Sequence, residues 1–122
     1  MAVPSVRDYL QRWLRWEHGR QGSGYDKLLL AANPFLIPFD LYLLRFPVGT
    51  YIPPHRDPVS KGRHYRLNII VKRSPVGGDF VCDHPIYQSS RINLFRSDIC
   101  THSVTKVEGG TRYVLSLGWL KR

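Results

Sequence analysis

The chain has 122 residues and a hydrophobic content of 43%, which suits one compact domain and is too short for two. With 3 Trp, 7 Tyr and 5 Phe it is too aromatic for a disordered protein, and its apolar runs are too short to span a membrane. A net charge of +9 favours anionic partners: nucleic acid, an anionic cosubstrate or substrate, or an acidic protein segment.

The first predicted element is an amphipathic helix over residues 5–18. Ser5 can cap it, and Asp8 at the third helical position completes a capping box. Apolar side chains at helical spacing share one side, so we expect this supporting helix to pack on one sheet: Val6, Tyr9, Leu10, Trp13, Leu14 and Trp16. After the break at 21–24, a second short helix is expected around residues 25–32. Because the start MAVPSVRDYLQRW lacks a signal peptide's apolar stretch, we expect a cytoplasmic protein.

From residue 41 to residue 120 the sequence consists of short β-type runs separated by turns. Strands are expected at 41–46, 49–52, 64–73, 79–82, 92–95, 102–107 and 111–120. Strands that follow one or two helices predict a mostly β (α+β) protein, built as a helix-backed β-sandwich or barrel. We find no repeat and no linker, so residues 1–122 are expected to form a single domain.

The stretch TYIPPHRDP at residues 50–58 contains the best candidate for a metal site. Of the 5 histidines, only His55 has a carboxylate two positions away, at Asp57. In an extended segment these side chains project to the same face, and the neighbouring prolines restrict the backbone, which lowers the entropy lost on binding a metal. His102, which opens a predicted strand, is the candidate third ligand. Such a set on one face of an octahedral iron leaves room for a cosubstrate and oxygen.

Arg112 follows ten residues after His102. We expect the neighbouring antiparallel strands at 102–107 and 111–120 to bring both into one cavity, where the guanidinium would bind a carboxylate bidentately. Ser116 shares the face of Arg112. Asn68 interrupts an apolar run and is either a ligand of cosubstrate or substrate or a satisfied core polar group. Weaker candidates for substrate contacts share the face of Asn68 or flank the expected mouth: Arg66, Tyr51 and Arg45.

The order of these motifs resembles that of the iron(II)- and 2-oxoglutarate-dependent oxygenases, in particular their prolyl-hydroxylase-like branch. The resemblance covers residues 41–120 and rests on HRD (55–57), RLNIIV (66–71), GGDF (77–80), NLF (93–95), HSV (102–104) and RYVLSLGW (112–119). It implies a double-stranded β-helix of jelly-roll or cupin type as the catalytic core. It also implies that His55, Asp57 and His102 bind Fe(II), and that Arg112 binds the far carboxylate of 2-oxoglutarate. The implied enzyme is a dioxygenase, usually a hydroxylase, that uses O2 and releases succinate and CO2, with ascorbate as a supporting reductant.

Other interpretations stay open. The expected substrate is a peptide or protein side chain, with a nucleic-acid base or a small molecule as alternatives. Cys82-X-His84 and Cys100-X-His102 could instead form a structural zinc site, although such pairs usually have two to four intervening residues. A non-catalytic metal-binding barrel and a basic nucleic-acid-binding module are further alternatives. Either the loops between the strands close over the substrate, or a partner or a second copy of the chain, forming a homodimer, covers the site.

Overall fold

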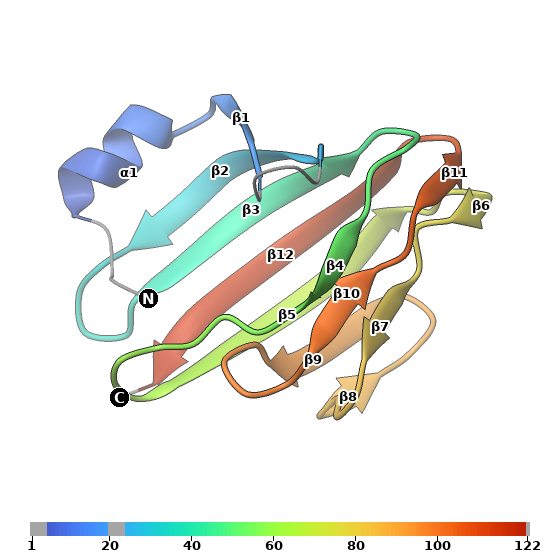
Figure 1. The fold of residues 1–122 in the computed structure, drawn as a ribbon. Helices are drawn as coiled ribbons and strands as arrows, with labels where there is room; N and C mark the ends of the chain where they lie inside the picture. Colours follow the sequence, from blue (N-terminus) through green and yellow to red (C-terminus); the bar gives the residue numbers. More distant parts are fainter. Residues whose placement is uncertain (1–4, 20–23, 122) are drawn as a thin grey trace.

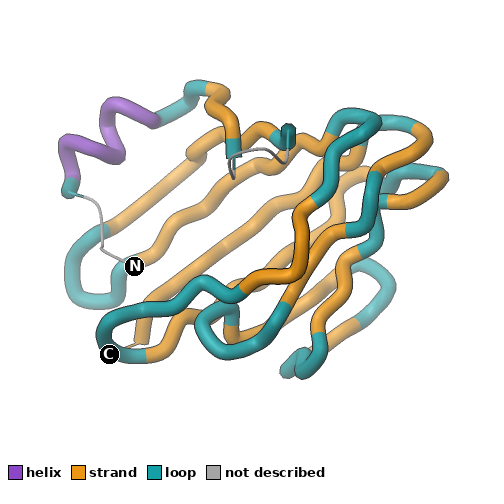
Figure 2. The backbone as a smooth tube through the Cα atoms, in the orientation of Figure 1, coloured by secondary structure: helices purple, strands orange, loops and turns teal. Residues whose placement is uncertain are grey.

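In the computed structural model, which describes residues 5–19 and 24–121, one short helix precedes two facing layers of strands (Figure 1, Figure 2). A seven-stranded sheet has the order β1-β2-β3-β12-β5-β9-β8, a three-stranded sheet has the order β4-β10-β7, and β11 pairs with β6. The elements are α1 (Val6–Arg12), β1 (Trp16–His18), β2 (Asp26–Asn33), β3 (Phe39–Phe46), β4 (Ile52–His55), β5 (Arg63–Lys72), β6 (Val76–Gly77), β7 (Phe80–Cys82), β8 (Tyr87–Gln88), β9 (Ile92–Arg96), β10 (His102–Val104), β11 (Val107–Gly109) and β12 (Arg112–Lys121).

The N-terminal helix is shorter than predicted. The capping box between Ser5 and Asp8 is present, but α1 ends at Arg12 instead of continuing to residue 18. The reason is that the next residues bond to β2: the Trp13 indole donates to the Leu30 carbonyl at 3.0 Å, and the Leu14 amide donates to the Leu29 carbonyl at 3.0 Å. These bonds to a neighbouring strand replace the helical ones. As a result Tyr9 is the buried residue of α1, whereas Leu10, Trp13 and Leu14 are exposed.

The second predicted helix, around residues 25–32, is wrong. Residues Asp26–Asn33 form strand β2, which lies between β1 and β3. Leu29 on β2 pairs with Tyr42 on β3, and both are buried with Tyr9 of α1 in one small cluster. Leu and Ala favour a helix in isolation, but pairing and packing in the sheet override that preference.

The space between the layers holds an apolar core and a set of buried polar side chains. The main core joins Phe46, Ile70 and Val114 of the large sheet to Val104 and Val107 of the opposite layer. The inner face of the large sheet also carries buried polar side chains: His64, Asn68, Asn93, Arg112 and Ser116. Alternation along β12 between buried and half-buried residues places its polar members on this inner face.

Strands β10 and β12 lie in different layers, so the predicted pairing of 102–107 with 111–120 is wrong. β10 pairs with β4 and β7, whereas β12 pairs with β3 and β5. Between them β11 pairs with β6, and the chain crosses to the large sheet there (Figure 1). His102 and Arg112 therefore approach one cavity from opposite walls.

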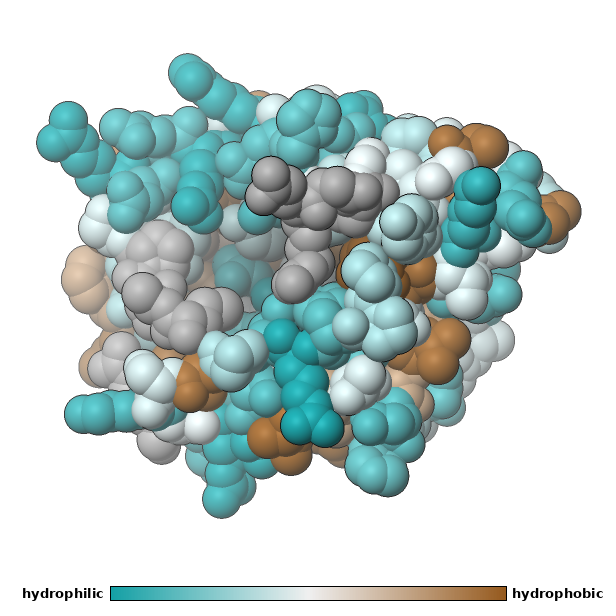
Figure 3. All heavy atoms as spheres, viewed as in Figure 1, coloured by the Kyte–Doolittle hydropathy of each residue, from teal (hydrophilic) through white to brown (hydrophobic). Residues whose placement is uncertain are grey.

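The face of the molecule that carries the small sheet is mainly hydrophilic (Figure 3). Among the described residues, no helix is both long and apolar enough to cross a membrane.

Candidate metal centre and cavity

Two histidines and one aspartate meet at the paired ends of β4 and β10. His55 ends β4, His102 begins β10, and the two are direct partners across the strand pair. Their ring centroids are 4.2 Å apart. The Asp57 carboxylate lies 3.7 Å from His55 Nε2 and 3.4 Å from His102 Nε2. One ligand atom from each of the three residues lies within 4.8 Å of the others, so one ion can contact all three.

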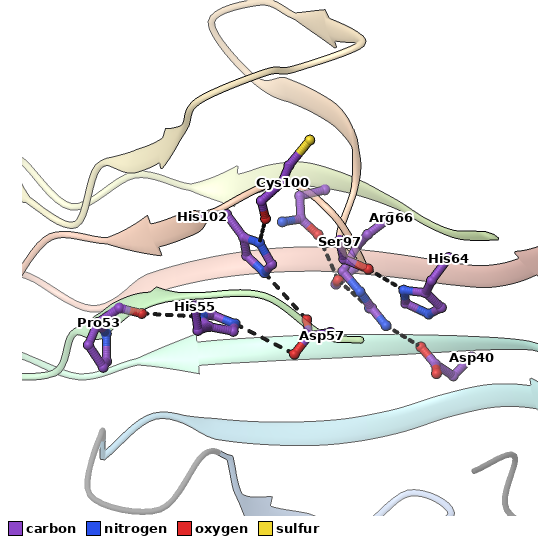
Figure 4. A network of polar contacts seen from close by, with 11 residues as sticks. Asp40, Pro53, His55, Asp57, His64, Arg66, Ser97, Cys100 and His102 are labelled. Atoms are coloured by element: carbon purple, nitrogen blue, oxygen red, sulfur yellow. Dashed lines mark hydrogen bonds and ion pairs between the residues drawn. The ribbon is translucent and has the colours of Figure 1, made fainter. Parts of the chain in front are cut away.

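Backbone carbonyls fix the orientation of both rings (Figure 4). Nδ1 of His55 bonds to the Pro53 carbonyl at 2.9 Å, and Nδ1 of His102 bonds to the Cys100 carbonyl at 2.9 Å. A carbonyl oxygen only accepts, so Nδ1 is the donor in each ring, and Nε2 of each ring is directed towards Asp57. Metal-binding histidines usually make such a hydrogen bond with the ring nitrogen that does not face the metal, and it fixes the orientation of the ring.

The Asp57 carboxylate is positioned by its backbone and kept ionised by its neighbours. The Asp57 amide donates to the Ser97 carbonyl at 2.8 Å, which ties the loop after β4 to the end of β9. Burial on its own raises the pKa of Asp57. The hydrogen bond from His102 and the charges of His55, His102 and Arg66 outweigh burial, and the pKa lies below its ordinary value. Two imidazole Nε2 atoms and one carboxylate form an N/O donor set that suits Fe(II).

A cavity of about 410 Å³ opens from this group to the inner face of the large sheet. Arg112 lines it and is only 3% exposed. Its guanidinium lies 5.0 Å from the centroid of the Phe46 ring, and within the described part of the chain it makes no hydrogen bond and no ion pair. Burial lowers the pKa of Arg112 to about 10, against the opposing effect of Asp79.

Asn68 and Ser116, by contrast, belong to a chain of hydrogen bonds along the cavity wall. Asp40 accepts from Arg66 at 3.0 Å, Arg66 donates to Ser116 Oγ at 2.7 Å, and Ser116 Oγ donates to Asn68 Oδ1 at 2.6 Å. Gly118 makes room for the Arg66 guanidinium, because a Cβ at Gly118 would lie 2.3 Å from Arg66 Nη2. The predicted residues Arg66, Asn68 and Ser116 all line the cavity. Their polar groups largely form hydrogen bonds with one another.

Tyr51 and Arg45, predicted at the mouth, do not line the cavity. Tyr51 is 47% exposed. Arg45 lies on the outer face of the large sheet, where it pairs with Asp26 at 3.0 Å and its guanidinium stacks over the Trp16 ring. A position near a predicted strand end does not determine which face of the sheet a side chain occupies, and a shift of one residue reverses it.

Sequence reasoning missed His64 and Asp40, which both line the cavity. His64 is 2% exposed and bonds to the Ser97 hydroxyl. Its position was detectable, because the alternation that places Arg66 and Asn68 on one face of β5 places His64 there as well. The position of Asp40 could not be detected from the sequence. Asp40 on β3 lies near Arg66 on β5 only because both strands pair with β12.

The paired glycines of the motif at 77–80 also have a structural explanation. Gly77 and Gly78 have φ of +74° and +68°, the left-handed region that favours glycine. A Cβ at Gly77 would lie 2.0 Å from the Lys106 carbonyl, and one at Gly78 would lie 3.1 Å from Cδ of Arg112. The motif therefore allows β6 to approach β11 closely beside the buried arginine.

No protein-family model and no curated protein sequence matches this chain. Solved structures do share its fold. KdgF from Halomonas sp. superposes with a TM-score of 0.58 at 16% identity over 88% of this chain and 87% of that one. A Pseudomonas putida prolyl-4-hydroxylase gives a TM-score of 0.56 at 18% identity over 70% of this chain. The DMSP lyase DddQ from Ruegeria pomeroyi gives 0.54 at 16% identity over 88% of this chain.

The match spans 52% of the prolyl-4-hydroxylase chain and 56% of the DddQ chain. At these identities the likeness concerns the fold alone. The prediction of a mostly β protein of double-stranded β-helix type is confirmed: the chain has a cupin-like fold with one short N-terminal helix and a His-Asp-His group able to hold a metal ion.

Proposed function

We propose that this protein is an Fe(II)- and 2-oxoglutarate-dependent dioxygenase, and that it hydroxylates its substrate with release of succinate and CO2. The observation that carries the proposal is Arg112. A cation that is only 3% exposed shares a cavity with His55, Asp57 and His102 and makes no hydrogen bond or ion pair to any described residue. A His-Asp-His group alone suits many reactions, but the added buried cation calls for a carboxylate-bearing cosubstrate.

The energetic argument rests on the cost of burying a charge. A buried cation without a partner is strongly unfavourable, and it becomes tolerable when an anion and its hydrogen bonds satisfy it. The lowered pKa of Arg112, about 10, expresses the same cost. A planar guanidinium matches a carboxylate bidentately, so one end of 2-oxoglutarate would neutralise Arg112 and leave its keto-acid end for the metal.

In this proposal the residues around the cavity have separate roles. His55, Asp57 and His102 would hold Fe(II), which with 2-oxoglutarate and O2 supplies the oxidising power for a C–H bond. The pKa of Asp57 lies below its ordinary value, so the carboxylate is ionised at neutral pH and needs to lose no proton before binding the ion. The rings of Phe80 and Phe95 lie beside His102, with centroid distances of 6.2 and 4.8 Å, and exclude water from that side.

For the substrate we propose a peptide or protein side chain. The motifs that resemble the prolyl-hydroxylase-like branch support this choice, and a nucleic-acid base or a free small molecule ranks behind it. The cations Arg12 and Lys27 also line the cavity, which suits an acidic or anionic substrate. A cytoplasmic location, ascorbate support and a homodimer stay predictions.

The test is an anaerobic titration of the protein with Fe(II) and 2-oxoglutarate. The expected result is a visible charge-transfer band. His102→Ala should abolish it, and Arg112→Met should weaken 2-oxoglutarate binding at least tenfold while iron binding is kept. Arg63→Met is the matched control, because Arg63 is an exposed arginine at the start of β5. Normal iron affinity in a His55→Ala, Asp57→Ala double variant would refute the metal assignment, and unchanged 2-oxoglutarate affinity in Arg112→Met would refute the cosubstrate.

Substrate class is measured separately, as succinate formed in the presence of peptides, oligonucleotides or cell extract. Stimulation by nucleic acid alone would reverse the proposed order. A normal charge-transfer band without any stimulated succinate production would favour a non-catalytic metal-binding barrel.

A further inference from the structure

A second group of metal-binding side chains lies beside the candidate iron centre. Cys82 ends β7, Asp83 follows it, and Cys100 stands in the turn that leads into β10. One ligand atom from each, two sulfurs and a carboxylate oxygen, lies within 4.8 Å of the others. Both cysteines are free thiols. The predicted alternative of a zinc site that combines both cysteines with His84 and His102 does not match this group, because His102 faces Asp57.

Backbone hydrogen bonds hold this group in place from both sides. Cys82 is the strand partner of His102, and the Asp83 amide donates to the Thr101 carbonyl at 3.2 Å. The Cys100 amide donates to the Arg96 carbonyl at 2.9 Å, and its thiol donates to the His84 carbonyl at 3.3 Å. The Cys100 sulfur points away from Asp57 (Figure 4). The thiols therefore form a separate site and add no ligand to the His-Asp-His group.

The donor chemistry of the two groups differs sharply. Thiolates select thiophilic ions such as Zn²⁺, whereas imidazole and carboxylate without sulfur suit iron. Zinc–sulfur bonds of about 2.3 Å in a tetrahedral site place two sulfurs about 3.8 Å apart. The two cysteine sulfurs lie within 4.8 Å of each other, so only a small movement of these side chains would bring the sulfurs to that spacing. The exposed Asp83 side chain has room to turn towards the sulfurs.

We propose that Cys82, Asp83 and Cys100 bind a thiophilic divalent cation, Zn²⁺ being the ion that two thiolates and a carboxylate fit best, with water at the fourth position. The ion would join the end of β7 to the turn before β10. Because the Cys100 carbonyl accepts from Nδ1 of His102, the same ion would brace the backbone that orients one iron ligand. The site stands on its own residues and holds whether or not the chain is an oxygenase.

Cobalt(II) titration of the full chain, without oxygen and with a phosphine reductant, reads the two sites separately. Bound sulfur gives a near-ultraviolet thiolate-to-cobalt charge-transfer band, which a His-Asp-His group cannot produce. Wild type should bind two equivalents and show this band, and Zn²⁺ should remove it. His55→Ala with His102→Ala should keep the band at one equivalent. Cys82→Ser with Cys100→Ser should lose the band and keep the other equivalent.

Two further variants guard against misfolding. Asp83→Asn keeps both thiols and is expected to weaken cobalt binding at this site at least tenfold. Val81→Ser changes an exposed neighbour on β7 and should leave the titration unchanged. Absence of the band in wild-type protein whose two thiols both react with a thiol reagent overturns the proposal, as does a band that disappears in the histidine double variant.

Discussion

The Arg66–Asp40 pair supports the cavity wall, and Asp40→Asn is the sharpest test of that role. The two side chains are 19% and 16% exposed and 3.0 Å apart. At that distance and an effective dielectric constant of about 20, the attraction is about 5.5 kcal/mol. Desolvation offsets part of it, and breaking a fully buried pair usually costs about 3–5 kcal/mol. Since this pair keeps some solvent contact, we expect Asp40→Asn to lower the free energy of unfolding by about 2–3 kcal/mol.

The assay is urea unfolding of a double-mutant cycle with Asp40→Asn, Arg66→Met and the double variant. A coupling energy of about 2 kcal/mol is expected, because each single change leaves the other charge buried. Glu108→Gln, at an exposed position on β11, is the control and should change stability by less than about 0.5 kcal/mol. A coupling below about 0.5 kcal/mol would show that the pair does not hold the wall and would refute the reasoning.

Three further predictions concern the space between the two layers. Gly118→Ala should displace the Arg66 guanidinium, since the new Cβ would lie 2.3 Å from Nη2, and its effect on stability should be less than additive with Asp40→Asn; full additivity would contradict this. Val107→Ala, at a position with 0% exposure, should cost about 2 kcal/mol in urea unfolding through lost burial and a residual cavity. Burial lowers the pKa of His64 from 6.5, so its neutral form is favoured in the folded state. Its contribution to stability is complete above pH 6.5 and is lost as pH falls towards the folded pKa, and His64→Asn should flatten that part of the stability profile.

Much of the fold could be predicted from the sequence because its strands alternate clearly. The run at 64–73 matches β5, and the run at 111–120 matches β12, each within a residue or so. The secondary-structure predictions that were wrong concern segments whose conformation is determined by pairing with a strand distant in the sequence. Residues 25–32 have helix-forming side chains but pair with β3, and residues 13–14 leave the helix to bond with β2. Which strand lies beside which is a long-range property that local periodicity does not contain.

In the candidate site, too, local spacing could be predicted from the sequence, whereas contacts that depend on long-range strand pairing could not. The spacing of His55 and Asp57 predicted a shared face, and the structure brings both to His102. Arg112 reaches the cavity as predicted, although by crossing between layers instead of by pairing with β10. Asp40 could not be found, because its contact with Arg66 depends on two strands that both pair with a third.

The hydrogen bonds from each histidine ring to the carbonyl two residues earlier make Pro53–His55 and Cys100–His102 self-contained units. The carbonyl that orients each ring thus lies within the same three consecutive residues as the ring. Wall residues that do not touch the rings, such as Asn68 and Ser116, can therefore be exchanged one at a time without removing the hydrogen bond that orients either imidazole. In evolutionary terms, a barrel built this way can acquire a new substrate while its metal-binding tripeptides are inherited intact, and a designer could transplant both onto another antiparallel strand pair.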